Sequence, residues 1–278
     1  MKQTFDKVSA ACSKLTTRAY STSFSMGIYC LDKHIHEAIY AIYGYVRFAD
    51  EIVDTFHEYN KADLFEEFKQ HTWKAIDQKI SMNPILNSFQ WVVNKYNIQP
   101  ELITCFLNSM ETDLNKNEHS AESYDQYIVG SAEVVGLMCL RVFTEGDDTL
   151  YNKLEYSARR LGAAFQKVNF LRDIKDDYEH LGRLYFPGIA FKTFSDADKA
   201  QIENDIEEDF RVAHEGIRQL PKPARFGVYV AYVYYKSLFN KIRQIPPGRI
   251  LMERVRISNQ RKLSLLVTSY FRHSFSMI

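Results

Sequence analysis

The sequence predicts an all-α fold, a multi-helix bundle in a single domain. Apolar residues recur three or four positions apart along most of the chain, which is the spacing of one helix face. Only 11 glycines and 7 prolines occur in 278 residues, and no run alternates apolar and polar residues between turn signals, as strands would. Hydrophobic residues make up 46% of the chain, including 19 Phe and 18 Tyr. This composition is ample for a core, with aromatic side chains left to line a cavity.

Eight segments carry the helical spacing. The first shows it in the series Ile39, Ile42, Val46, Ala49 and Val53. Each proline lies between two segments or at the edge of one, where a residue without an amide hydrogen belongs. The predicted helices are 36–56, 61–80, 99–115, 122–144, 150–179, 200–218, 223–243 and 256–275.

Composition and charge limit the domain organisation and the kinds of binding partner that are expected. No stretch rich in Gly, Ser and Pro marks a linker, so one domain over residues 1–278 is expected. The 35 basic and 35 acidic residues balance, which argues against a nucleic-acid partner. The cysteines form no C-x-x-C pair and are interpreted as reduced thiols: Cys12, Cys30, Cys105 and Cys139. With a polar N-terminus and no apolar run near twenty residues, a cytoplasmic protein is expected, with membrane contact and oligomeric state left open.

The longest interruption of the helical pattern lies near 181–193, directly after an acidic helix end. It contains Arg183 and Tyr185, between Gly182 and Pro187. A loop in this position could close over a site as a lid, and it could equally be an ordinary connector.

One polar face interrupts the apolar pattern of the helix predicted at 36–56. Core-like neighbours such as Ala49 and Val53 surround it, which is unusual for a solvated surface. Its members are spaced four, three and four residues apart and therefore share one side of the helix: Tyr43, Arg47, Asp50 and Asp54.

A second polar face lies on the helix predicted at 150–179. Gln166, Asn169, Asp173 and Asp177 fall three, four and four residues apart and again share one side. Gly162, one turn earlier on that side, leaves room for another group to approach. Both faces combine paired acids with uncharged hydrogen-bonding side chains, which indicates an enclosed polar site.

Paired carboxylates alone are weak evidence, because this acid content gives about four i,i+4 pairs by chance. Like charges at that spacing repel by roughly 0.2–0.5 kcal/mol even on an exposed helix, and a cleft raises the cost unless a cation neutralises them. Carboxylate and amide oxygens suit Mg²⁺, which typically bridges carboxylates to phosphate. Spacing therefore leaves two interpretations open, a metal–diphosphate site and a solvated surface.

The two faces resemble the aspartate-rich motifs of the squalene and phytoene synthase family. The stretch 43–54 is similar to the first motif, and 166–177, in the form Q-x-x-N-x-L-R-D-x-x-x-D, is similar to the second. GRLYFP at 182–187 resembles the basic segment of phytoene synthases, the bacterial ones in particular. Further similarities keep the family's order along almost the whole chain: YSTSF at 20–24, Tyr234, and RVRISNQRK at 254–262.

This resemblance implies an isoprenoid-synthase-like bundle with a central cavity and a Mg²⁺-dependent prenyltransferase, with Mn²⁺ able to substitute. Two molecules of geranylgeranyl diphosphate would join head to head, through a cyclopropyl (prephytoene) diphosphate, to give phytoene for carotenoid biosynthesis. Metal and cationic side chains would stabilise the leaving diphosphate, and apolar walls would keep water from the carbocations. The alternative is the same chemistry on farnesyl diphosphate, giving squalene or dehydrosqualene; squalene would also need a nicotinamide reductant.

The resemblance also assigns roles to residues. Metal would be held by Asp50, Asp54, Asn169, Asp173 and Asp177. Catalysis is expected of Asp50, Asp54, Asp173, Asp177, Tyr43 and Arg47. Substrate contacts are expected from Tyr20, Ser21, Ser23, Tyr43, Arg47, Gln166, Arg172, Arg183, Tyr185 and Tyr234.

One position departs from the family pattern. The usual V-A-G-T-V-G segment reads SAEVVG at 131–136, so Glu133 stands where the family has glycine. Either Glu133 faces away from the substrate or it changes the pocket and with it the preferred chain length.

Two other functions match parts of the sequence. The D-x-x-H spacings at 54–57 and 177–180 match the carboxylate–histidine spacing of di-iron helix bundles, with Glu111 and Glu133 as further ligands. That interpretation gives Arg47 and Arg172 no role. A catalytically inactive scaffold of the same fold is the other candidate, but the paired aspartates that such a protein would lack are present.

Overall fold

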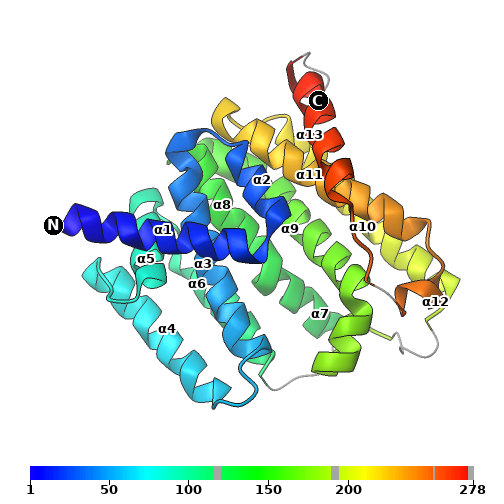
Figure 1. Cartoon of the computed structure of the whole chain (residues 1–278), viewed down its shortest axis with the longest axis horizontal. Helices are drawn as coiled ribbons and strands as arrows, with labels where there is room; N and C mark the ends of the chain where they lie inside the picture. The colour runs from blue at the N-terminus through cyan, green and yellow to red at the C-terminus, as the bar shows by residue number, and fades with distance from the viewer. Residues whose placement is uncertain (115–119, 189–193, 253, 275–278) are drawn as a thin grey trace.

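Helices form the regular structure in the computed structural model, which describes residues 1–114, 120–188, 194–252 and 254–274 (Figure 1). No β-strand occurs within those ranges, which confirms the predicted all-α class. Two single-turn π-helices, η1 (Val129–Glu133) and η2 (Asp177–Leu181), follow α7 and α9. The α-helices are α1 (Lys2–Tyr20), α2 (Thr22–Tyr29), α3 (Lys33–Asp54), α4 (Lys61–Gln78), α5 (Pro84–Tyr96), α6 (Pro100–Thr112), α7 (Ala121–Ile128), α8 (Val134–Thr144), α9 (Asp148–Asp176), α10 (Asp196–Ile217), α11 (Lys222–Arg243), α12 (Pro247–Ile250) and α13 (Asn259–Ser274).

All eight predicted segments are helical, but apolar periodicity does not predict α1, α2, α5 and α12. Helix α1 buries Ser9, Ser13 and Thr17, so its inner face carries no apolar stripe. Helix α5 is buried on nearly every side and starts at Pro84, which sits in its first turn rather than between helices. Apolar periodicity finds a helix only when one face is apolar and the other is polar.

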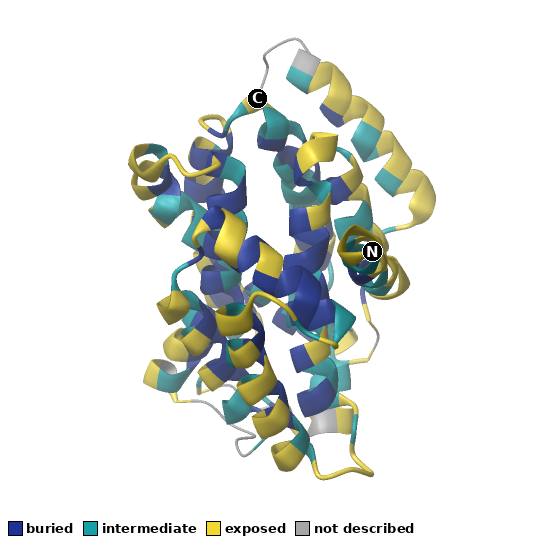
Figure 2. Cartoon of the chain, turned by 90° about the vertical axis from the view of Figure 1, so that its left-hand side faces the viewer, coloured by how far each residue is buried: buried dark blue, intermediate teal, exposed yellow. Residues whose placement is uncertain are grey.

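The core consists of three apolar clusters, and the same cavity borders each of them. The largest lies among α3, α4, α5, α6 and α8, where the rings of Tyr45 and Phe89 stack with centroids 3.6 Å apart. The second joins α9, α10 and α11 around the fully buried Phe210 and Phe239. Figure 2 shows these buried residues running along the inner faces of the helices, with exposed residues outside.

Side-chain caps fix where the helices that carry the polar faces begin. Asp32 accepts a hydrogen bond from the amide of His34 at the start of α3, and Asp147 accepts one from Leu150 at the start of α9. Such caps satisfy amides that have no partner within the helix. They fix the residues at which the two motif-bearing helices begin.

One helical run, Glu122–Thr144, is long and apolar enough to cross a membrane by length and composition, among the residues the structure describes. It is longer than any apolar run expected from the sequence. Of its most apolar stretch, 67% is buried inside the protein. Core helices pass the same test, and the burial places this run among them.

Helix α9 passes very close to η1 at Gly162. A Cβ atom built there would lie 2.5 Å from the carbonyl oxygen of Ala132 and 3.2 Å from the Cα of Glu133. Gly162 therefore leaves room for the backbone of η1. This close approach lets α9 and η1 both reach the cavity wall.

Gly162→Ala is expected to destabilise the protein by roughly 1–3 kcal/mol, since η1 must move away from the new methyl group. A loss of stability is expected although alanine favours a helix over glycine by about 1 kcal/mol. Urea unfolding measures the change. Gly248→Ala is the matched control because a Cβ there meets no atom within 4 Å; equal stability of the two variants would contradict the close approach.

Candidate active site

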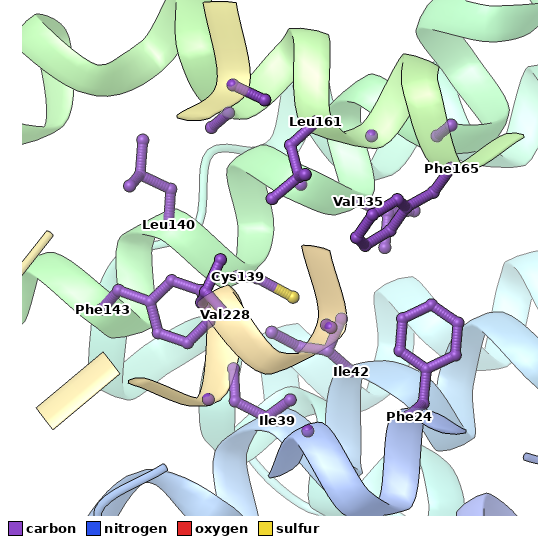
Figure 3. A pocket seen from close by; sticks show the side chains of 18 of the residues that line it. Phe24, Ile39, Ile42, Val135, Cys139, Leu140, Phe143, Leu161, Phe165 and Val228 are labelled. Atoms are coloured by element: carbon purple, nitrogen blue, oxygen red, sulfur yellow. The ribbon is translucent and has the colours of Figure 1, made fainter. Parts of the chain in front are cut away.

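An apolar cavity of about 300 Å³ lies among α2, α3, α8, α9, α10 and α11. Figure 3 shows Leu140 and Phe143 towards one end and Phe24 and Phe165 towards the other. Aliphatic and aromatic side chains make up most of its wall. Such a lining suits a hydrocarbon chain, because each Å² of apolar surface removed from water contributes about 25 cal/mol.

Polar side chains from both predicted faces border this cavity. Tyr43 of α3 and Gln166 and Asn169 of α9 line it. The Phe24 and Tyr43 ring centroids are 5.5 Å apart, so these groups lie at the Phe24 end. Burial raises the pKa of Tyr43 to about 12, and its hydroxyl therefore stays protonated as a hydrogen-bond donor.

The four predicted aspartates form one electrostatic cluster. Burial and the charge of Asp54 raise the pKa of Asp50 to about 7. Burial, with the charges of Asp173 and Asp54, raises the pKa of Asp177 to about 8. Because Asp54 belongs to the first motif and Asp177 to the second, the fold brings both motifs to one place, as a shared metal–diphosphate site requires.

Arginines balance three of these four carboxylates. Arg172 donates from Nε to Asp173 over 2.8 Å. Among the described residues, no ion pair or side-chain hydrogen bond engages the carboxylate of Asp177. The pairs are Arg47 with Asp50, Arg183 with Asp54, and both Arg172 and Arg254 with Asp173.

Arg183 ties the segment after η2 to the cluster. Its side chain is only 4% exposed and donates to Asp54 Oδ1 over 2.6 Å and to the carbonyl oxygen of Asp113 over 2.9 Å. Gly182, at φ +65°, turns the chain into this position. The described part of the predicted lid or connector, 182–188, thus packs into the site, while 189–193 lie outside the described residues.

Asp113, at the end of α6, belongs to the site although the sequence analysis does not identify it. It accepts a hydrogen bond of 2.6 Å from the hydroxyl of Tyr127. Burial raises its pKa to about 7, against the opposing effect of the Arg183 charge. No second acid stands one helical turn away from it, so spacing gives no signal.

The YSTSF run lies beside the first motif. The guanidinium carbon of Arg47 sits 4.3 Å from the centre of the Tyr20 ring, a cation–π contact. Ser21 caps α2 by accepting from the amide of Phe24. Ser23, in the first turn of α2, is half-buried.

Two of the tyrosines expected at the site, Tyr185 and Tyr234, occupy different environments. Tyr185 is buried, stacks on Phe170 at 3.8 Å and accepts a hydrogen bond from Arg183. The structure does not bring Tyr234 to the cavity lining. Its neighbour Tyr235 points to another side of α11, because one residue turns a helix by about 100°, and it donates over 3.4 Å to Asn169, which lines the cavity.

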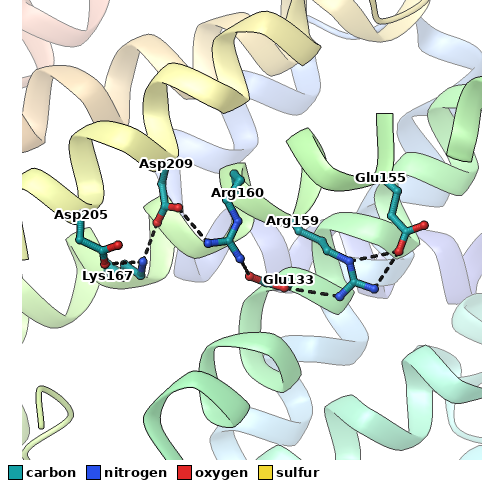
Figure 4. Close-up of polar contacts among 7 residues, drawn as sticks. All are labelled: Glu133, Glu155, Arg159, Arg160, Lys167, Asp205 and Asp209. Atoms are coloured by element: carbon teal, nitrogen blue, oxygen red, sulfur yellow. Dashed lines mark hydrogen bonds and ion pairs between the residues drawn. The ribbon is translucent and has the colours of Figure 1, made fainter. Parts of the chain in front are cut away.

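Glu133 faces away from the cavity, which resolves the two alternatives for this position. Its carboxylate is buried behind α9 and pairs with Arg159 and Arg160. Figure 4 shows the ion pairs continuing from Arg160 through Asp209 to Lys167.

The carboxylates suggested for a di-iron site are therefore not assembled. Glu133 is held by arginines, and Glu111 pairs with Lys69 at 2.9 Å. Within the described ranges, no group of three or more His, Cys, Asp and Glu side chains is placed to hold a metal ion unaided. The oxygen donors that the Asp side chains and Asn169 offer are the kind that Mg²⁺ takes, and Mg²⁺ needs only one or two protein carboxylates when phosphate and water complete its shell.

Comparison with known proteins agrees with this geometry. The family model for squalene/phytoene synthase matches residues 17–261. The chloroplastic phytoene synthase 1 of Zea mays is 23% identical over 266 residues, which cover 87% of this chain and 62% of the maize protein. The chain thus spans less than two thirds of that relative's length.

In two further matches, the aligned region covers similar shares of this chain and of the matched protein. The 4,4'-diapophytoene synthase of Staphylococcus haemolyticus is 26% identical over 198 residues, 68% of this chain and 66% of its own. The crystal structure of a dehydrosqualene synthase in complex with ligand is similar with a TM-score of 0.84, at 21% identity and covering 98% of each chain. At that identity the structural likeness establishes the fold.

Without divalent metal, the free energy of unfolding should fall as pH rises from about 4 to about 8. The native pKa of Asp177, about 8, exceeds its ordinary 3.8, so the folded protein retains a proton that the unfolded chain has lost. Asp177→Asn should gain on the order of 1 kcal/mol at pH 8, allowing for solvent screening. Urea unfolding at pH 5 and 8 measures this, with Asp176→Asn as control; parallel pH dependence in wild type and Asp177→Asn would refute it.

Proposed function

This chain belongs to the squalene/phytoene synthase family, and on that premise we propose that it joins two isoprenoid diphosphates head to head. The observation that carries the proposal is an apolar cavity whose polar end adjoins a cluster of aspartates and arginines. An isoprenoid diphosphate has the same two parts, a hydrocarbon chain and a polyanionic head.

The proposed metal ligands are Asp50, Asp54, Asn169, Asp173 and Asp177. When bound there, Mg²⁺ or Mn²⁺ would stabilise the negative charge that develops on the departing diphosphate. The raised pKa values of Asp50 and Asp177 support this role, because added positive charge would favour the ionised carboxylates.

The arginines take a second role in this proposal. Arg47, Arg172 and Arg183 pair with carboxylates in the structure. With metal held by those carboxylates, the guanidinium groups would be available to the phosphate oxygens, which suit their bidentate geometry. The buried Arg183 would hold the segment 182–188 over the diphosphate.

Aromatic rings at the polar end of the cavity would face the carbocation. Phe24, Tyr43 and Phe165 line this end, and Tyr235 stacks on Phe165 with centroids 4.0 Å apart. The π faces of such rings attract cations. The aliphatic wall beyond them excludes water that would otherwise quench the cation.

We take geranylgeranyl diphosphate as the substrate and phytoene as the product. The GRLYFP segment and the relatives named phytoene synthase support this choice. Glu133, the departure from the family pattern, faces away from the cavity and so does not shorten it. The relative named 4,4'-diapophytoene synthase supports the alternative, condensation of farnesyl diphosphate.

Incubation with Mg²⁺ and each diphosphate separately, followed by mass spectrometry of the extracted hydrocarbons, tests the proposal. A C40 product from geranylgeranyl diphosphate, lost on adding a chelator, is the expected result. A C30 product alone would keep the reaction and change the substrate. Folded protein that forms no hydrocarbon and releases no diphosphate would favour the scaffold alternative.

Asp50→Asn and Asp173→Asn should each lower turnover by at least about a hundredfold, because each removes charge that holds the metal. Helical circular dichroism and melting temperature should stay near those of the wild type. Asp77→Asn, an exposed acid on α4, is the control and should keep full activity. Normal turnover in both site variants would exclude the metal assignment.

A further inference from the structure

Helix α13 carries an apolar stripe that faces away from the protein. Leu263, Val267 and Phe271 are each four residues apart, so they share one side of the helix; Tyr270, on the neighbouring side, packs its ring edge-on against Phe226 of α11 at 6.1 Å. Each of them is between 48% and 61% exposed. Figure 2 shows α13 at the upper right, leading to the C-terminal trace, with most of its visible residues exposed.

The opposite side of α13 is docked on the bundle, which fixes the direction of the stripe. Ser269 is fully buried, and the ring of Phe226 on α11 lies 5.1 Å from the ring of His273. Lys262 donates to the hydroxyl of Thr22 over 2.9 Å, at the start of α2. The stripe therefore belongs to a helix that is held in place, and Leu263, Val267 and Phe271 face away from the described part of the bundle.

Positive charge concentrates in the same part of a chain whose net charge is zero. Residues 241–273 hold eight Lys and Arg and a single acid, a local charge of +7. Arg256, Arg261 and Arg272 are exposed, and none forms an ion pair within the described residues. Arg261 and Arg272 stand at the two ends of the stripe along the helix.

From this combination we infer that α13 docks on an anionic lipid surface. Apolar and aromatic side chains inserted into the headgroup region, with unpaired arginines nearby, are how amphipathic helices bind such surfaces. The positive charge complements anionic lipid, and a protein partner would need an acidic and an apolar face together. The docking does not depend on the proposed reaction.

Docking would also place the cavity near the bilayer. Thr22, bonded to Lys262, lies two residues before Phe24, which lines the polar end of the cavity. Isoprenoid chains partition into membranes, so a lipid-bound α13 would hold the site where a substrate of that class concentrates.

Co-flotation with vesicles of phosphatidylcholine alone, and of phosphatidylcholine with one third phosphatidylserine, tests the inference without any activity measurement. Wild type should bind the anionic vesicles at least roughly tenfold more strongly, and salt should weaken that binding. The double variant Val267→Ser/Phe271→Ser should lose roughly tenfold in partitioning. Val8→Ser/Leu15→Ser is the matched control, since it removes two exposed apolar residues from α1.

A second pair separates charge from apolar contact. Arg261→Gln/Arg272→Gln should lower binding to anionic vesicles only, and Lys7→Gln/Arg18→Gln on α1 should leave it unchanged. The inference would be overturned if wild type floats with neither vesicle. It would also be overturned if the α1 and α13 variants lose vesicle binding to the same extent. A wild-type dimer that ignores vesicles and dissociates on Val267→Ser/Phe271→Ser would overturn it as well, since the stripe would then bind a second copy.

Discussion

Repulsion among carboxylates is the constraint on which the rest of this structure depends. Asp50 and Asp54 on α3 and Asp173 and Asp177 on α9 and η2 occupy one partly buried cluster, and Asp113 approaches it from α6. Burying such charges is costly unless opposite charge compensates for them. Four arginines supply part of that charge, and the raised pKa of Asp177 marks where compensation is incomplete. The divalent cation proposed for this site would offset that excess of negative charge.

The surrounding helices hold the cluster against its own repulsion. Gly162 lets α9 approach η1 at backbone distance. Behind α9, the buried carboxylate of Glu133 joins Arg160, which also binds Asp209. Removing one member of such a network leaves a buried charge unpaired, so it fixes the position of α9. Glu133 thus acts on the outside of the cavity wall and leaves the apolar lining intact.

The sequence predicted the helical class, eight helices and the two aspartate faces, because each carries a periodic signal. It missed α1, whose buried face is Ser and Thr, and Asp113, which has no partner acid at helical spacing. The resemblance predicts a substrate contact for Tyr234, and in the structure its neighbour Tyr235 is the one that contacts Asn169. A resemblance aligned to within one residue cannot say which side of a helix faces inward; that depends on packing between elements far apart in the chain.

The most direct test of a shared site is Mn²⁺ binding, followed by the electron paramagnetic resonance of free Mn²⁺, with and without inorganic pyrophosphate. One site built from both helices predicts that pyrophosphate tightens Mn²⁺ binding, and that Asp50→Asn on α3 and Asp173→Asn on α9 each weaken it by roughly tenfold or more. If Mn²⁺ binding stays unchanged in one or both of these variants, the two motifs do not act together, which would contradict a shared metal site.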